Sequence, residues 1–290
     1  MSKIKIIELD DEQPPPIARP LAPAPASRRF DPSGKSVYVA VPAFGCLVHN
    51  AFMSSLLMFN IEAAKRGLPV YVDMLGNESL VQRARNILLA RFKKSPATHI
   101  LFIDSDIAFQ PETVFRALEF DKPCVSCAYP KKMIDFDRVV AKVTEKDPEA
   151  VQSIHSCGLD YNINIAESVK ASRDGFIPVL DAATGFLLIK RGLVEALERK
   201  FSDLTVVNDI ISSRDDVPTY VDLFECIRDP VDDKGNKRLL SEDYSFSRKV
   251  QQLGERVYMD IASVIAHNGN MMFSGDIRDR MRKTVKYELS

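Results

Sequence analysis

One run of residues in the first half of the chain constrains the fold more than any other. Residues 99–106 read His-Ile-Leu-Phe-Ile-Asp-Ser-Asp, so an uninterrupted apolar stretch leads directly into two carboxylates separated by one small residue. A short apolar run of this kind is typical of a strand buried on both faces of a parallel sheet. The carboxyl ends of such strands are where open α/β sheets bind ligands. We therefore expect an α/β protein with a binding site at the end of this strand.

The two acids themselves suggest a chemistry. Asp104 and Asp106, with only Ser105 between them, can hold a hard divalent cation and leave room for a phosphate oxygen. This arrangement indicates metal-dependent chemistry on a nucleotide diphosphate. The same residues could instead form a strand-ending turn, with Asp104 capping it and Asp106 starting the next element. The triplet from Asp135 to Asp137 has the same spacing but no buried strand before it, and we interpret it as a surface loop.

Strand-like and helix-like segments alternate from Val37 onward, which favours βα units and a mainly parallel sheet. In the first half we expect strands at 37–41, 70–72, 99–103 and 124–128, and helices at 50–65, from a cap at Asn77 to about 92, and after Pro111. The second half is less regular, with strands expected at 177–180, 185–189, 220–227 and 257–265 and helices at 193–200 and 243–253.

Bulk properties exclude several classes of protein. A chain of 290 residues can form one large or two small domains, and its net charge of -1 gives no general attraction to nucleic acid or anionic membranes. No segment approaches the ~20 consecutive apolar residues that span a bilayer, and the first residues lack the apolar core of a secretory signal. The five cysteines are scattered, which indicates free buried thiols. We expect a soluble, cytoplasmic protein.

Residues 1–34 are rich in proline, which disfavours both helices and ladder strands. We expect this tail to be disordered or polyproline-like. It would serve either as a passive linker or as a docking segment for a partner.

Further polar residues lie near the expected ligand edge. Asp73 follows the second strand and could accept hydrogen bonds from a uracil or guanine N–H or from ribose hydroxyls, or it could be an ordinary turn residue. Arg83 and Asn86 are three residues apart on the expected helix and therefore share a face. Arg83 would suit a diphosphate or a base edge, with a solvated surface position as the alternative. Arg85 is expected to point to solvent.

Four short motifs occur in a set order along residues 36–270: Asp104-Ser105-Asp106, Ala183-Thr184-Gly185-Phe186, Ser241-Glu242-Asp243-Tyr244 and His267-Asn268-Gly269. In their order and spacing they resemble those of the GT-A-fold glycosyltransferases, most closely the family-2-like and Anp1-like groups. The resemblance implies an α/β GT-A domain at 35–290. Residues 35–130 would be a Rossmann-like nucleotide-sugar half with a mostly parallel central sheet, and residues 131–290 an acceptor half with C-terminal elements.

The resemblance also implies ligands. The donor would be a nucleotide sugar such as a UDP- or GDP-sugar, the acceptor a hydroxyl group, and the cofactor Mn²⁺ or Mg²⁺, which suits oxygen ligands and one imidazole. Asp106 would bind the metal directly, and Asp104 would reach the ribose or a metal-bound water. His267 would be a third ligand, although a lone histidine is more often a core or surface residue.

Roles for the remaining residues follow from the same resemblance. Pro42, Ala43, Phe44 and Asp73 would flank the nucleoside, while Arg83, Asn86, Asp104 and Ser105 would contact the rest of the donor. Thr184 and Gly185 would line the acceptor and the sugar, unless they form an ordinary turn.

The acidic pair Glu242-Asp243 would contain the catalytic base of an inverting enzyme. Asp243 would take the acceptor's proton and Glu242 would position hydroxyl groups. Carboxylates at this place also stabilise any helix start, so capping alone is an alternative. The stereochemical outcome stays open, because retaining enzymes of this fold have no such base. A sugar-phosphate nucleotidyltransferase and a catalytically inactive binding protein of the same fold are the competing functions.

Overall fold

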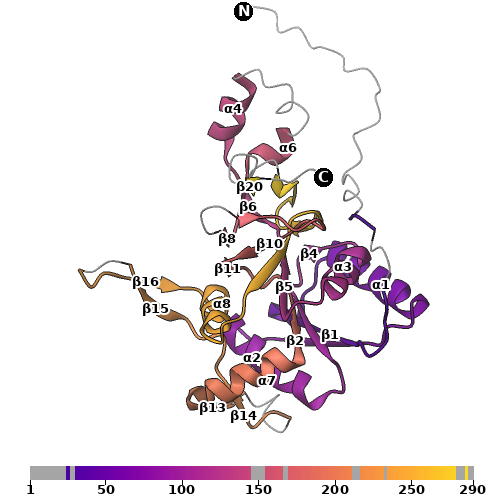
Figure 1. The fold of residues 1–290 in the computed structure, drawn as a ribbon, viewed down its shortest axis with the longest axis vertical. Coiled ribbons are helices and arrows are strands. Elements are labelled where there is room, and N and C mark those ends of the chain that lie inside the picture. The colour runs from indigo at the N-terminus through magenta and orange to yellow at the C-terminus, as the bar shows by residue number, and fades with distance from the viewer. Residues whose placement is uncertain are drawn as a thin grey trace, which may run out of the picture.

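The computed structural model describes residues 24–26, 30–144, 154–165, 169–210, 216–231, 234–278 and 285–286, so most of the proline-rich tail lies outside the described residues. A seven-stranded sheet with the order β10-β17-β5-β12-β3-β1-β2 forms the centre of the molecule (Figure 1). Its strands are β1 Val37–Ala43, β2 Val70–Gly76, β3 His99–Ile103, β5 Cys124–Cys127, β10 Phe176–Val179, β12 Phe186–Lys190 and β17 Val257–Asp260.

The direction of these strands confirms a mostly parallel sheet. β2, β1, β3, β5 and β17 run the same way, and only β12 and β10 run against their neighbours. β12 comes from the second half of the chain, yet it pairs with β3 on one side and β5 on the other. One strand from the second half of the sequence therefore lies between two strands from the first half within one sheet.

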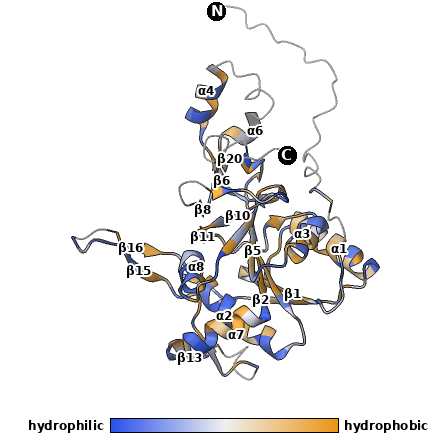
Figure 2. Cartoon of the chain, viewed as in Figure 1, coloured by the Kyte–Doolittle hydropathy of each residue, from blue (hydrophilic) through white to orange (hydrophobic). Residues whose placement is uncertain are grey.

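Helices cover both faces of the sheet, and two separate groups of buried side chains result. One face is packed by α1 (Asn50–Lys65) and α3 (Pro111–Phe120), and the other by α2 (Val81–Lys94), α7 (Arg191–Lys200) and α8 (Glu242–Gln252). β3 is fully buried between them, as its unbroken apolar sequence predicts. Figure 2 shows apolar strands at the centre of the molecule.

Short elements surround this three-layer body. The helices are α4 (Phe136–Thr144) and α6 (Ile154–Cys157), with 3-10 turns at Phe44–Cys46 and Ser202–Leu204. The small sheets pair β4 (Ile107–Ala108), β18 (Ala266–Asn268) and β19 (Met272–Ser274); β6 (Pro130–Ile134) and β7 (Leu159–Tyr161); β8 (Ile163–Asn164) and β11 (Asp181–Ala182); β9 (Val169–Lys170) and β20 (Val285–Lys286); β13 (Thr205–Val207) and β14 (Thr219–Val221); and β15 (Ile227–Pro230) and β16 (Lys237–Leu240). The β15–β16 hairpin projects away from the body (Figure 1).

Several local predictions are wrong. The strand expected at 257–265 ends at Asp260, whereas the strand expected at 70–72 extends to Gly76. Helix α2 begins at Val81 rather than after Asn77, which has a left-handed φ of 59°; the Glu78 carboxylate instead accepts the backbone N–H of Leu80. The segment 220–227 is two strands with a turn between them. The triplet 135–137 is not a surface loop: helix α4 begins at Phe136, and the carboxylate of Asp135 just before it accepts the backbone N–H of Arg138.

The cysteines are all free, but only Cys124, Cys127 and Cys157 are buried, whereas Cys46 and Cys226 are exposed. The expectation of buried thiols therefore holds for three of the five. Within the described ranges, none of the helices combines the length and the apolar character needed to cross a bilayer.

Candidate active site at the end of strand β3

The turn that follows β3 is held in place by backbone hydrogen bonds. The Asp104 N–H donates to the Gly185 carbonyl at 3.1 Å, and the Ile107 N–H donates to the Asp104 carbonyl at 3.1 Å. The Ser105 carbonyl accepts the N–H of His49, just before helix α1. The turn therefore presents Asp104 and Asp106 from a rigid backbone at the carboxyl edge of the sheet.

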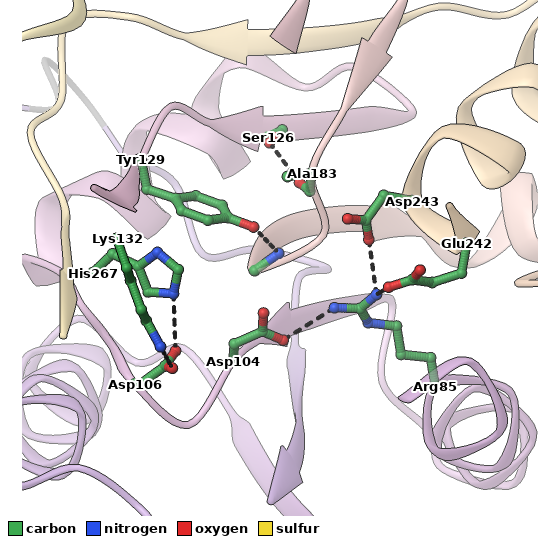
Figure 3. A network of polar contacts seen from close by, with 11 residues as sticks. Arg85, Asp104, Asp106, Ser126, Tyr129, Lys132, Ala183, Glu242, Asp243 and His267 are labelled. Carbon is green, nitrogen blue, oxygen red and sulfur yellow. Dashed lines mark hydrogen bonds and ion pairs between the residues drawn. The ribbon is translucent and has the colours of Figure 1, made fainter. Parts of the chain in front are cut away.

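Arg85 is the centre of a buried charge cluster, which makes the expectation that it points to solvent wrong. Its guanidinium donates to Asp104 Oδ1 at 3.1 Å, Glu242 Oε1 at 2.6 Å and Asp243 Oδ1 at 2.7 Å, and its side chain is only 3% exposed. Figure 3 shows these carboxylates converging on Arg85 from β3 and from the start of α8. The sequence does not predict these ion pairs, because the three acids that bind Arg85 come from distant parts of the chain.

Asp243 has the environment of a proton acceptor. Burial raises the pKa of its carboxyl group above the ordinary range of aspartate, although the Arg85 guanidinium acts in the opposite direction. Thr184 is fully buried near this carboxylate, and its hydroxyl makes no hydrogen bond with any described residue. At the start of α8, the Ser241 side chain makes no capping hydrogen bond, and both acids of the first turn are directed to Arg85.

Gly185 lies where no side chain would fit. Its N–H donates to the phenolic oxygen of Tyr129 at 2.9 Å, and Tyr129 is itself buried. A Cβ atom on Gly185 would come within 2.6 Å of Tyr129 Cζ and 3.0 Å of Asp104 Oδ2. The glycine therefore allows the side chains of Tyr129 and Asp104 to lie directly against the backbone at this position.

Replacing Gly185 with alanine should destabilise the protein by about 1–3 kcal/mol, because the new methyl group overlaps a buried ring. Chemical denaturation of the purified variant measures this loss. Gly192 is the matched control, since its Cβ would meet nothing within 4 Å and it lies in helix α7. Alanine there should leave stability equal or raise it by up to ~1 kcal/mol. Equal stability of the two variants would contradict the close packing at Gly185.

Asp106 and His267 form a second group on the other side of Asp104 (Figure 3). His267 Nε2 lies 3.5 Å from Asp106 Oδ1, a buried oxygen that makes no hydrogen bond with any described residue. His267 Nδ1 lies 2.9 Å from the Pro130 carbonyl, which fixes Nδ1 as the protonated nitrogen. Nε2 and Oδ1 are then two acceptors that face each other, and a proton or a metal cation between them satisfies both. An outer hydrogen bond to a carbonyl is also the usual support of a metal-binding histidine.

The pair Asp106–His267 fits a metal ion better than the three residues expected from the sequence, Asp104, Asp106 and His267. Asp104 is directed to Arg85, and in the part of the chain that the structure describes no group of three or more histidine, cysteine or acidic side chains is placed to hold a metal. Asp106 also carries an ion pair from Lys132 on its other oxygen. Metal binding by Asp106 and His267 remains a prediction.

Among the residues expected around the nucleoside, Asp73 does not follow the second strand, as the sequence predicts, but lies within β2 beside Ala40 of β1, away from the carboxyl ends of these strands. Asp73 accepts from the Tyr38 hydroxyl and from Arg91. At the end of β1, Pro42 is half-buried, Ala43 is buried, and the Phe44 side chain is 72% exposed.

On α2, the two expected donor contacts, Arg83 and Asn86, have polar partners other than the acids that bind Arg85. Arg83 is paired with Glu78 at 2.9 Å and lines an open groove of about 360 Å³ together with Leu80, Val206 and Tyr220. Asn86 is buried, and its amide joins Asp222 and the backbone N–H of Phe224. The structure thus brings Asp104, Thr184, Gly185, Glu242 and Asp243 together, while donor binding by Arg83 and Asn86 stays a prediction.

No protein-family model and no curated protein matches this sequence. Among solved structures, the chain is similar to A197 from STIV, with 14% identity, a TM-score of 0.44 and coverage of 81% of this chain and 86% of that one. It is similar to a nucleoside-diphosphate-sugar pyrophosphorylase from Vibrio cholerae RC9, with 9% identity, a TM-score of 0.36 and coverage of 77% and 90%. A third is GalNAc-T7 with UDP, GalNAc and Mn²⁺, with 11% identity, a TM-score of 0.36 and coverage of 80% and 43%. At these values the likenesses do not assign the chain to a family.

Proposed function

We propose that this protein is a metal-dependent glycosyltransferase, which moves a hexose or pentose from a UDP- or GDP-sugar to a hydroxyl acceptor. The observation that carries the proposal is the meeting of two groups at the carboxyl edge of the sheet. One is the buried carboxylate of Asp243 with its raised pKa, and the other is the Asp106–His267 pair. Asp104 lies between them (Figure 3).

The charge balance of the site supports a bound divalent cation. Among the described residues, the four carboxylates of Asp104, Asp106, Glu242 and Asp243 form ion pairs with two cationic side chains that are always charged, Arg85 and Lys132. Partly buried negative charge in excess is unfavourable unless it is compensated. Mn²⁺ or Mg²⁺ held by Asp106 and His267 would compensate it and, when bound, would neutralise charge on the leaving nucleoside diphosphate.

The other residues would act on the acceptor. Asp243 would accept the proton of the attacking hydroxyl, for which a carboxylate with a raised pKa is suited. Glu242 would orient hydroxyl groups beside it, and Thr184 and Gly185 would form the wall of the acceptor position. Arg85 would hold the carboxylates of Glu242 and Asp243 in a fixed position through its ion pairs with both.

Exchange of Asp106 for asparagine tests the proposal. The unmodified protein should unfold at higher temperature with Mn²⁺ and a UDP- or GDP-sugar, since a ligand at 100 times its dissociation constant stabilises the fold by ~2.7 kcal/mol. D106N should lose the Mn²⁺-dependent part of this shift. D137N is the matched control, because Asp137 lies in the exposed second Asp-x-Asp triplet and should respond like the unmodified protein.

An equal Mn²⁺ response of D106N would exclude this metal site. Product analysis then tests the reaction itself. Release of a free nucleoside diphosphate from the donor supports transfer, whereas pyrophosphate release from a nucleoside triphosphate and a sugar phosphate would identify a nucleotidyltransferase. Donor binding without either product would identify a binding protein.

A further inference from the structure

Lys132 is paired with the carboxylate of Asp106, on which the proposed metal site depends. Its ammonium group is ion-paired with Asp106 Oδ2, while Asp106 Oδ1 faces His267 (Figure 3). The stem of Lys132 passes closely over Gly269, where an added Cβ would lie 3.1 Å from Lys132 Cδ. The Lys132 side chain is nevertheless 39% exposed, so its charged end can leave Asp106 without disturbing the core.

A divalent cation and the Lys132 ammonium group would compete for Asp106. A cation held between Asp106 and His267 would lie beside the ammonium group, and two positive charges that share one carboxylate repel each other. The metal can therefore bind tightly only if Lys132 turns away. A nucleoside diphosphate would supply anionic oxygens as an alternative partner for the ammonium group, as lysine commonly binds phosphate.

We infer that Lys132 is an internal counter-ion, which competes with the divalent cation for Asp106 and moves to the diphosphate when metal and nucleotide bind together. The inference rests on the proposed function, because it takes Asp106 and His267 as the cation site. Binding of metal and nucleotide is then cooperative, because each ligand weakens the pairing of Lys132 with Asp106.

Lys131 provides a matched control on the same strand. It belongs to β6, like Lys132, but its ammonium group pairs with Asp160 at 2.7 Å rather than with Asp106. Removing Lys131 takes away the same charge from the same strand and leaves the Asp106 carboxylate untouched. Any effect specific to Lys132 therefore comes from its contact with Asp106.

The test measures Mn²⁺ binding to the full chain by the electron paramagnetic resonance signal of free Mn²⁺, with no acceptor and no turnover. Lys132→Met should bind Mn²⁺ about tenfold more tightly than the unmodified protein, because a charge-assisted hydrogen bond to the carboxylate no longer competes. Lys131→Met and the charge-conserving Lys132→Arg should stay close to the unmodified protein. Added UDP or GDP should tighten Mn²⁺ binding roughly fivefold or more in the unmodified protein and clearly less in Lys132→Met.

Each other result has a separate meaning. Equal Mn²⁺ affinities of Lys132→Met and the unmodified protein overturn the inference and leave the proposed function standing. An equal gain in Lys131→Met also overturns it, because the effect would then be one of general charge. Absence of Mn²⁺ binding in every variant overturns both the inference and the metal part of the proposed function.

Discussion

Replacing Arg85 with methionine should destabilise the protein by about 3–5 kcal/mol, because it leaves the partly buried carboxylates of Asp104, Glu242 and Asp243 facing one another without their shared cation. Urea denaturation measures the change in the free energy of unfolding. The loss should be greatest at neutral pH and should shrink in acid, because burial raises the pKa of Asp243, whose protonation removes one of the three negative charges.

Arg199→Met is the control for this experiment. Arg199 is exposed in the last turn of helix α7, so its replacement should change stability by less than about 0.5 kcal/mol. If Arg85→Met were as stable as this control, the carboxylates would not depend on Arg85. A loss of equal size at pH 4 and pH 7 would show that lost packing, not unpaired charge, is the cause.

Replacing Asp243 with asparagine should lower kcat for sugar transfer by about 10²–10⁴-fold, because an amide cannot accept the proton of the acceptor hydroxyl. Donor binding should persist, since Asp106 and His267 are unchanged. The stability of the variant should be equal or higher, because burial disfavours the charged form of Asp243. Donor titration, kinetics and denaturation together separate a catalytic role from a structural one.

Asp137→Asn is again the matched control, because Asp137 also lies in the first turn of a helix and loses the same interaction with the helix dipole. The pH dependence adds an independent check. Asp243 must be deprotonated to act, so kcat should rise with pH through its pKa, and burial places this rise above the ordinary aspartate value of about 4. Full activity of D243N would assign proton acceptance to another group.

Local sequence patterns were sufficient to predict the central sheet. The apolar run of β3 and the 3.6-residue period of α1 are set by neighbours in the chain, and both elements begin and end where expected. The same holds for the acids at the carboxyl end of β3. The start of α2 departs from the prediction because Asn77 has a left-handed backbone and lies four residues before Val81, while the Glu78 carboxylate accepts the N–H of Leu80 just before the helix.

The charge network could not be predicted in the same way. Arg85 lies three and four residues before Leu88 and Leu89, so the helix period places it on the buried face of α2, but the period cannot identify the acids that it meets there. Its burial depends on Asp104 and on Glu242 and Asp243 in α8, which approach only after the sheet has formed. The contact of Lys132 with Asp106 likewise joins residues that are far apart in the sequence, one in the short strand β6 and the other just after β3.

The position of β12 between β3 and β5 has a consequence for engineering this protein. A fragment that stops after residue 130 would lack the strand that joins β3 to β5, and would leave both with unpaired backbone groups. The second half of another chain therefore cannot be grafted onto this one as an independent module. Exchange of a surface segment such as the β15–β16 hairpin would leave the order of the central sheet intact.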